Sequence, residues 1–167
     1  NSDERLAVAV LVICGAEILA DGLNLAYRIV ERSELPVEKL LSTCCQLLVQ
    51  KDKVEQVSLV VSGIQEWEAL RPEAVDAALH PVLHIVAANN QNNYLDSLVR
   101  LLSSDQAKME TFIACGRLKS AYLVAVHRGH HEDIERVQEV AQLGGQMHIV
   151  AMCNKWLANS CQSVSLS

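Results

Sequence analysis

Apolar residues recur at helical spacing along almost the whole chain, and this periodicity restricts the fold more than any other feature. In "LPVEKLLSTCCQLLVQ", for example, one face of a helix is formed by Val37, Leu40, Leu41, Cys44, Leu47 and Leu48. The chain has only 7 Gly and 3 Pro, too few for the many tight turns of an all-β fold. The pattern predicts an all-α fold of about ten helices.

The predicted helices are joined by short connections, which force neighbouring helices to run antiparallel. We therefore expect antiparallel helical hairpins stacked as an α-solenoid. A compact all-α bundle is the alternative, and it differs because a solenoid contacts mainly its sequence neighbours. We expect one helical repeat domain over residues 1–167, with a flexible point in the polar stretch "NNQNN" at 89–93.

The sequence also predicts a helix cap, a disrupted helix and a frayed C-terminal tail. Asp3 should cap a first helix that runs to about Ile13 and is terminated by Cys14 and Gly15. Pro81 lies inside a predicted helix over 72–88 and should kink or break it, because proline lacks the backbone donor. The tail "CQSVSLS" (161–167) should be frayed.

Composition and charge exclude several classes of protein. Half of the residues are hydrophobic and 20% are charged, which is typical of a folded chain with a sizeable core. The formal net charge of −6 argues against a nucleic-acid module and against nonspecific docking on an anionic bilayer. No apolar run approaches the roughly 20 residues that a spanning helix needs. The opening "NSDERL" lacks Met and does not resemble a signal peptide, so we expect a fragment of a longer protein.

The stretch "HRGHH" places three histidines close together, which raises the question of a metal site. His127 lies near the end of one predicted helix, and Gly129 suits the position just after it. His130 and His131 come next, with acidic residues in the first turn of the following helix, where the helix dipole favours them. We therefore interpret the stretch as the corner between two helices.

No other metal-binding or catalytic motif is complete in the sequence. His80 and His84 are spaced i, i+4, but Pro81 stands where a metalloprotease motif needs Glu. The cysteines form no CxxC pair, and we expect them to be reduced and mostly buried: Cys14, Cys44, Cys45, Cys115, Cys153 and Cys161. The sequence has no GxSxG and no phosphate-binding Gly-rich loop, so we assign no catalytic, metal-binding or cofactor-binding residue and expect no enzyme activity. An all-α metal-binding enzyme that uses the five histidines named above is an alternative hypothesis.

One predicted helix, over 116–128, has features of a docking surface. Ala121 and Ala125 are four residues apart and would let a neighbouring helix approach closely. Arg117 and Lys119 lie in the first turn, where the helix dipole disfavours cations by a few tenths of a kcal/mol. This mismatch suggests an acidic partner, either within the array of helices or outside it, and we predict a partner-binding surface at Arg117, Lys119 and Tyr122.

Two long motifs resemble one known family. "CGRLKSAYLVAVHR", followed by an acidic helix and "MCNKWL", resembles the C-terminal end of the spastizin family, FYVE-finger proteins linked to hereditary spastic paraplegia. "DGLNLAYRIVERSELPVEKLLSTCCQLLVQKDKVEQVSLVVSGI" resembles the helical segment before that end. The resemblance extends from about residue 6 to 158, is weakest over 64–92, and indicates a diverged orthologue. Its motifs are packing motifs rather than catalytic ones.

The resemblance implies a non-enzymatic interaction scaffold. Such proteins act in endosome and lysosome trafficking, autophagic lysosome reformation and cytokinesis. The implied partners are spatacsin, subunits of the fifth adaptor complex and beclin. The implied location is cytoplasmic, peripheral to late endosomes and lysosomes, with the centrosome or midbody as a further site. The fragment lacks the FYVE finger, so we expect no direct membrane binding by it. A solenoid piece of another vesicle tethering or coat complex is the alternative.

Overall fold

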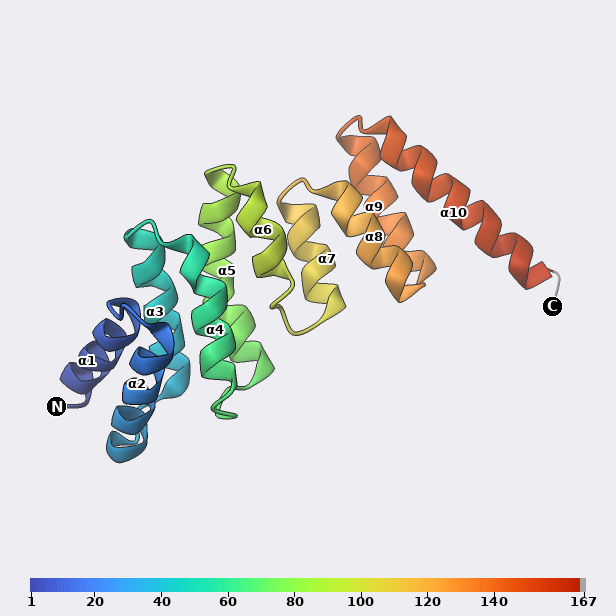
Figure 1. Ribbon diagram of the computed structural model, residues 1–167. Coiled ribbons are helices and arrows are strands. Elements are labelled where there is room, and N and C mark those ends of the chain that lie inside the picture. The colour runs from blue at the N-terminus through green and yellow to red at the C-terminus, as the bar shows by residue number, and fades with distance from the viewer. Residues whose placement is uncertain (166–167) are drawn as a thin grey trace. The chain divides into compact units, whose positions relative to one another are not determined.

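The computed structural model describes residues 1–165, and the side chains of residues 1–161. This described part contains ten α-helices, one short 3₁₀ helix and no strand, which confirms the all-α prediction (Figure 1). The helices are α1 (Ser2–Cys14), α2 (Leu19–Ser33), α3 (Val37–Gln50), η1 (Val54–Gln56), α4 (Val57–Gln65), α5 (Pro72–Ala88), α6 (Asn92–Val99), α7 (Asp105–Ala114), α8 (Leu118–Arg128), α9 (His131–Leu143) and α10 (Met147–Ser165).

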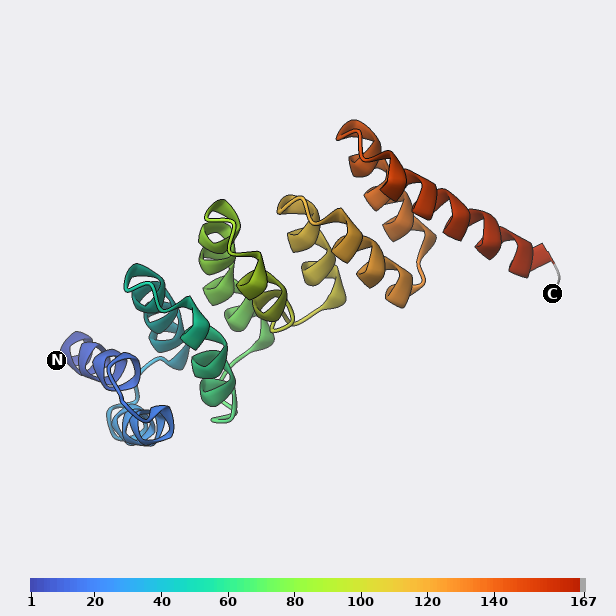
Figure 2. The same cartoon turned by 45° about the horizontal axis from the view of Figure 1, so that its top comes forward.

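The helices group into two compact units, Asn1–Ser103 and Ser104–Ser167. In the first unit α1, α3 and α5 form one row, and their hairpin partners α2, α4 and α6 form a second (Figure 2). In the second unit α8 packs against α7, α9 and α10. Stacked antiparallel hairpins, as predicted for a solenoid, are confirmed within each unit. The division falls at Ser103, outside 89–93, and the expectations of one domain and of a flexible point stay predictions.

The core of the first unit is built on the apolar stripe seen in the sequence. Leu40, Leu41, Cys44, Cys45 and Leu48 of α3 are all inaccessible to solvent. They are buried because α3 packs against α1, α4 and α5 together. The period of the stripe thus decides which side of α3 faces its neighbours.

Helix ends are set by local chemistry, and one predicted cap was wrong. Asn1, not Asp3, caps α1, since its side-chain oxygen accepts from the N–H of Asp3 at 3.0 Å. The Ser104 hydroxyl oxygen accepts from the N–H of Ala107 at 3.1 Å and begins α7. Gly129 ends α8 at φ 74°, a left-handed conformation that glycine adopts without strain.

Two expectations around α5 need correction. The helix is not broken at Pro81 and runs without interruption from Pro72 to Ala88, whereas a kink at that position stays a prediction. Pro81 and Ala77, whose carbonyl loses its helical donor, both lie on the exposed side, where water can replace that bond. The polar stretch after α5 is a tight turn rather than a five-residue loop, because α6 already begins at Asn92.

The C-terminal tail was expected to be frayed, but α10 continues into it as far as Ser165. Residues 166–167 lie outside the described residues.

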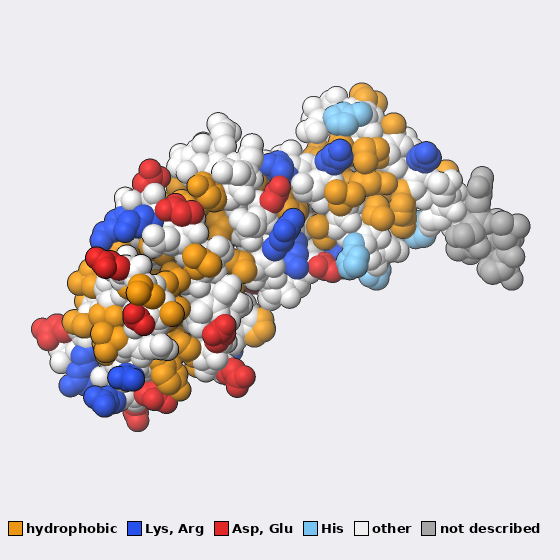
Figure 3. Space-filling view, in the orientation of Figure 1, with side chains coloured by type: hydrophobic (Ala, Val, Ile, Leu, Met, Phe, Trp, Pro, Cys, Tyr) orange, Lys and Arg blue, Asp and Glu red, His pale blue; other side chains and the backbone are white. Residues whose placement is uncertain are grey.

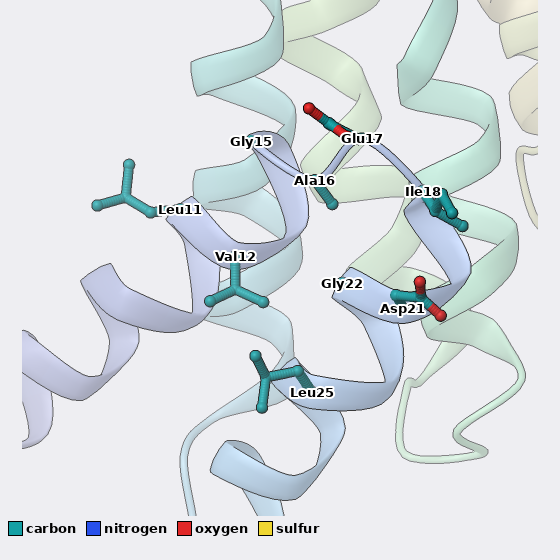
Figure 4. Close-up of a pocket in the computed structure, with 9 residues that line it drawn as sticks. All are labelled: Leu11, Val12, Gly15, Ala16, Glu17, Ile18, Asp21, Gly22 and Leu25. Carbon is teal, nitrogen blue, oxygen red and sulfur yellow. The ribbon is translucent and has the colours of Figure 1, made fainter.

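The first unit also carries an apolar groove between α1 and α2 (Figure 4). The helices approach closely at Gly22, where a Cβ would lie 2.7 Å from both Ala16 Cβ and the carbonyl oxygen of Val12. Leu11, Ile18 and Leu25 line the groove and are 58%, 62% and 49% exposed. Contact between the two helices therefore depends on a glycine at position 22.

Candidate partner-binding surface

The three residues predicted from the sequence lie at the start of α8. Arg117 is the residue before the helix, and its side chain makes no capping bond to it. Lys119 is exposed, whereas Arg117 and Tyr122 are half-buried. Lys119 and Tyr122 are three residues apart, so they lie on the same side of α8.

The structure brings the beginning of α10 to these residues. A shallow pocket is lined by Arg117, Lys119 and Ser120 on one side and by Gln146, His148 and Ile149 on the other. His148 adds a further titratable nitrogen beside the two cations. His148 could not be assigned to this surface from the sequence, because helix α9 separates it from Lys119 in the chain and only packing brings the two together.

Apolar side chains continue the surface away from this pocket. Leu123 is 57% exposed, and Tyr122 and Val126 are half-buried beside it on α8. Met152 is half-buried on α10, four residues after His148 and three before the exposed Lys155. Figure 3 shows hydrophobic side chains gathered over α8 and the start of α10, with Lys, Arg and His at their edges. We define the α8–α10 face by these residues: Arg117, Lys119, Tyr122, Leu123, Val126, His148, Met152 and Lys155.

The position of α8 is fixed from its opposite side. Ala121 and Ala125 are completely buried, which confirms the close helix approach predicted from their spacing. At the end of the helix, Nε of Arg128 lies 2.9 Å from Oδ2 of Asp133 in α9. The same guanidinium donates from Nη1 to Oε1 of Gln106 in α7 at 2.5 Å. Because both ion-pair partners are largely buried, this contact fixes α8 between its neighbours and leaves the α8–α10 face outward.

The histidines are part of the helix corner, as predicted. His127 lies in the last turn of α8, and α9 begins at His131 immediately after the cap residue His130. His131 Nε2 lies 2.5 Å from the hydroxyl of Ser160, and its ring centroid is 5.3 Å from that of Trp156. These contacts attach the start of α9 to the last turns of α10.

Metal-ligand clusters are absent from the part of the chain with described side chains. No three His, Cys, Asp or Glu residues there come together in a way that could hold a metal ion. His80 and His84 are exposed neighbours on α5 with ring centroids 5.3 Å apart. They therefore form a pair without a third ligand.

The cysteines are free, as expected, and most are buried. Burial raises the pKa of the Cys45 thiol to about 12. Its neighbour Cys44 also has a raised pKa, first because of a hydrogen bond with Cys14 and then because of burial. Burial likewise raises the pKa of Cys115 and Cys153. Thiols with raised pKa values stay protonated near neutral pH and are poor nucleophiles.

Among the described helices, none is both long and apolar enough to cross a membrane.

Comparison with known proteins identifies relatives over nearly the full chain. A family model described as "ZFYVE26-like, TPR repeats" matches residues 36–158. Zinc finger FYVE domain-containing protein 26 of Bos taurus is 26% identical over 165 residues, and the Homo sapiens protein of that name is 24% identical over 163. Each alignment covers 96% of this chain and 6% of the relative, so the chain spans only a small part of their length. No solved structure matches the chain.

The family model covers most of the chain, including α3 to α9 in full and the first part of α10. It describes repeats of the kind that the helical hairpins of both units form. The spastizin resemblance noted in the sequence is confirmed by these matches. The chain therefore belongs to the family of ZFYVE26-like TPR repeats.

Proposed function

We propose that this chain is a non-enzymatic protein–protein interaction module of a spastizin-like trafficking scaffold. The observation that carries the proposal is the α8–α10 face, which combines an exposed Leu123 with the cations Arg117 and Lys119 in a family of helical repeats. Helical repeat arrays use such extended surfaces to bind other proteins. The proposed setting is the cytoplasmic side of late endosomes and lysosomes, in autophagic lysosome reformation, and the midbody in cytokinesis.

The proposed partners are a spatacsin-like protein and subunits of the fifth adaptor complex, with beclin as a further candidate. They follow from the resemblance to the spastizin family. The chain itself supports the chemistry proposed for the partner, because a surface with cations around an apolar centre is complementary to carboxylates around an apolar anchor.

A pull-down with purified 1–167 tests the proposal. The prey are the spatacsin-like protein and the adaptor subunits, each expressed separately, and the bait is either the unaltered chain or Arg117→Glu/Lys119→Glu. Acidic residues are favourable near the beginning of a helix, so the double reversal should leave α8 intact, which circular dichroism can check. We expect the unaltered chain to retain at least one partner and the variant to lose most of it.

Arg5→Glu/Arg28→Glu is the matched control. It makes the same change in net charge at two exposed positions of the first unit, outside the proposed surface. Equal loss of binding in the control would indicate a general charge effect. Absence of binding by the folded, unaltered chain to every prey would refute the proposed partners.

A further inference from the structure

Charges in the second unit are segregated between alternate helices. Its acidic residues all lie on α7 and α9, and neither α8 nor the described side chains of α10 contribute one. Those acidic residues are Asp105, Glu110, Glu132, Asp133, Glu135 and Glu139. Because α8 and α10 are in contact with each other, neither helix contributes a carboxylate from its described side chains to the surface that they share.

Half of these acidic side chains already have a cationic partner within the unit. Asp105 pairs with Lys108, and Glu110 pairs with Arg136 at 3.3 Å. Asp133 pairs with Arg128, as described above. In contrast, Lys119 and Lys155 take part in no ion pair with any described residue. The face therefore carries positive charge that the unit itself does not neutralise.

The apolar residues of the face define the shape of the occupant. Tyr122, Leu123 and Val126 lie on one side of α8, and Met152 lies on α10 between His148 and Lys155. Together these side chains form an apolar patch on two helices in contact, and Leu123, at 57% exposure, is its most accessible member. An amphipathic helix can lay its apolar face, with residues at i, i+4 and i+7, on such a surface.

We propose that the α8–α10 face binds an acidic amphipathic helix of a partner protein. This inference rests on the proposed function and adds the chemistry of the partner's docking segment. The apolar side chains of that helix lie along Tyr122, Leu123 and Met152, and its Asp or Glu side chains lie against Lys119, His148 and Lys155. An anionic membrane is the less suitable occupant, because polybasic lipid-binding segments concentrate about four to eight Lys or Arg residues. This face has Arg117, Lys119 and Lys155 only.

A selection that does not presuppose the partner tests the inference. A displayed library of helical peptides with randomised surface positions is selected on immobilised 1–167, with Leu123→Asp/Lys119→Glu used for counter-selection. We expect the enriched peptides to carry an apolar stripe flanked by Asp and Glu. Their affinity for Arg117→Glu/Lys119→Glu should be roughly tenfold lower, and it should fall as salt is raised.

Control variants distinguish binding at the α8–α10 face from nonspecific hydrophobic binding. Leu59 on α4 is 59% exposed, closely matching Leu123 at 57%, so Leu59→Asp should leave peptide binding unchanged while Leu123→Asp weakens it. Enrichment of neutral or basic peptides, or no enrichment, would overturn the inference. Co-sedimentation with vesicles of phosphatidylcholine and phosphatidylserine, lost on the same substitutions, would also overturn it in favour of a membrane.

The two proposals can fail separately. Selection of acidic amphipathic peptides together with a negative pull-down would refute the named partners and support the docking chemistry. A positive pull-down that is insensitive to Leu123→Asp and to the charge reversal would support the interaction module and refute this docking site.

Discussion

The close packing of α8 can be tested by enlarging one of its buried alanines. Ala121 is completely buried, and Ala125, one turn later on the same side, is completely buried as well. No solvent-facing path is therefore open to a larger side chain, and an indole must displace neighbouring helices. Insertion of a large side chain into a packed core typically costs about 1–3 kcal/mol. We expect Ala121→Trp to lower the free energy of unfolding by that amount.

Thermal and urea denaturation followed by circular dichroism measure the effect. For a chain of this length 1 kcal/mol corresponds to roughly 2–4 °C in Tm, so the predicted fall is about 2–12 °C. Leu123→Trp is the matched control, since it places the same side chain on the same helix at a position that is 57% exposed. The control should change the free energy of unfolding by no more than about 0.5 kcal/mol.

The two tryptophan variants together test whether Ala121 is buried and Leu123 exposed. An unchanged Tm for Ala121→Trp would show that Ala121 faces open space, and the close approach of α8 to its neighbours would be wrong. Equal losses in both variants would place Leu123 in the core and would remove the most exposed apolar residue from the α8–α10 face.

Gly22→Ala should lower the free energy of unfolding by about 1–2 kcal/mol, because the contacts of 2.7 Å with Ala16 Cβ and the Val12 carbonyl oxygen outweigh the gain in helix propensity. Gly63→Ala should cost less, since its Cβ would meet only the flexible side chain of Leu23, and equal losses in urea melts would contradict this difference. In native protein at pH 8, a thiol reagent should label exposed Cys161 and leave Cys45 unlabelled until unfolding; prompt labelling of Cys45 would disprove its burial. The pKa of Cys45 is raised from 9.0 to about 12, so the protonated thiol stabilises the folded state fully below pH 9. This contribution to the free energy of unfolding is lost as the pH rises from 9 toward 12. Cys45→Ala should therefore reduce the loss of stability at alkaline pH.

Most of the helices could be predicted from the sequence because helical periodicity is a local property. The apolar stripe of α3 is the buried side of that helix, and the "HRGHH" corner has the cap glycine and first-turn acids that its sequence implied. Of the kink or break predicted at Pro81, the break did not occur, and the reason is tertiary. Water can replace a missing backbone donor where the freed carbonyl is exposed, and packing turned that side of α5 outward.

The candidate surface was predicted only in part. Arg117, Lys119 and Tyr122 were found because they are adjacent in one helix and conflict with its dipole. His148, Met152 and Lys155 were missed, although the lack of any acidic residue in both 118–128 and 147–161 was a usable signal. Leu123 was missed because a helical leucine next to buried alanines is usually assigned to the core.

The sequence by itself determined the all-α class, the family and the helix that begins the candidate surface, since these depend on spacing and motif order along the chain. Only the tertiary structure decided that α10 lies beside α8 and that Leu123 is exposed while Ala121 is buried. The physical reason is that residues distant in the chain meet only when burial of apolar surface fixes how the helices pack, and one helix cannot specify that alone.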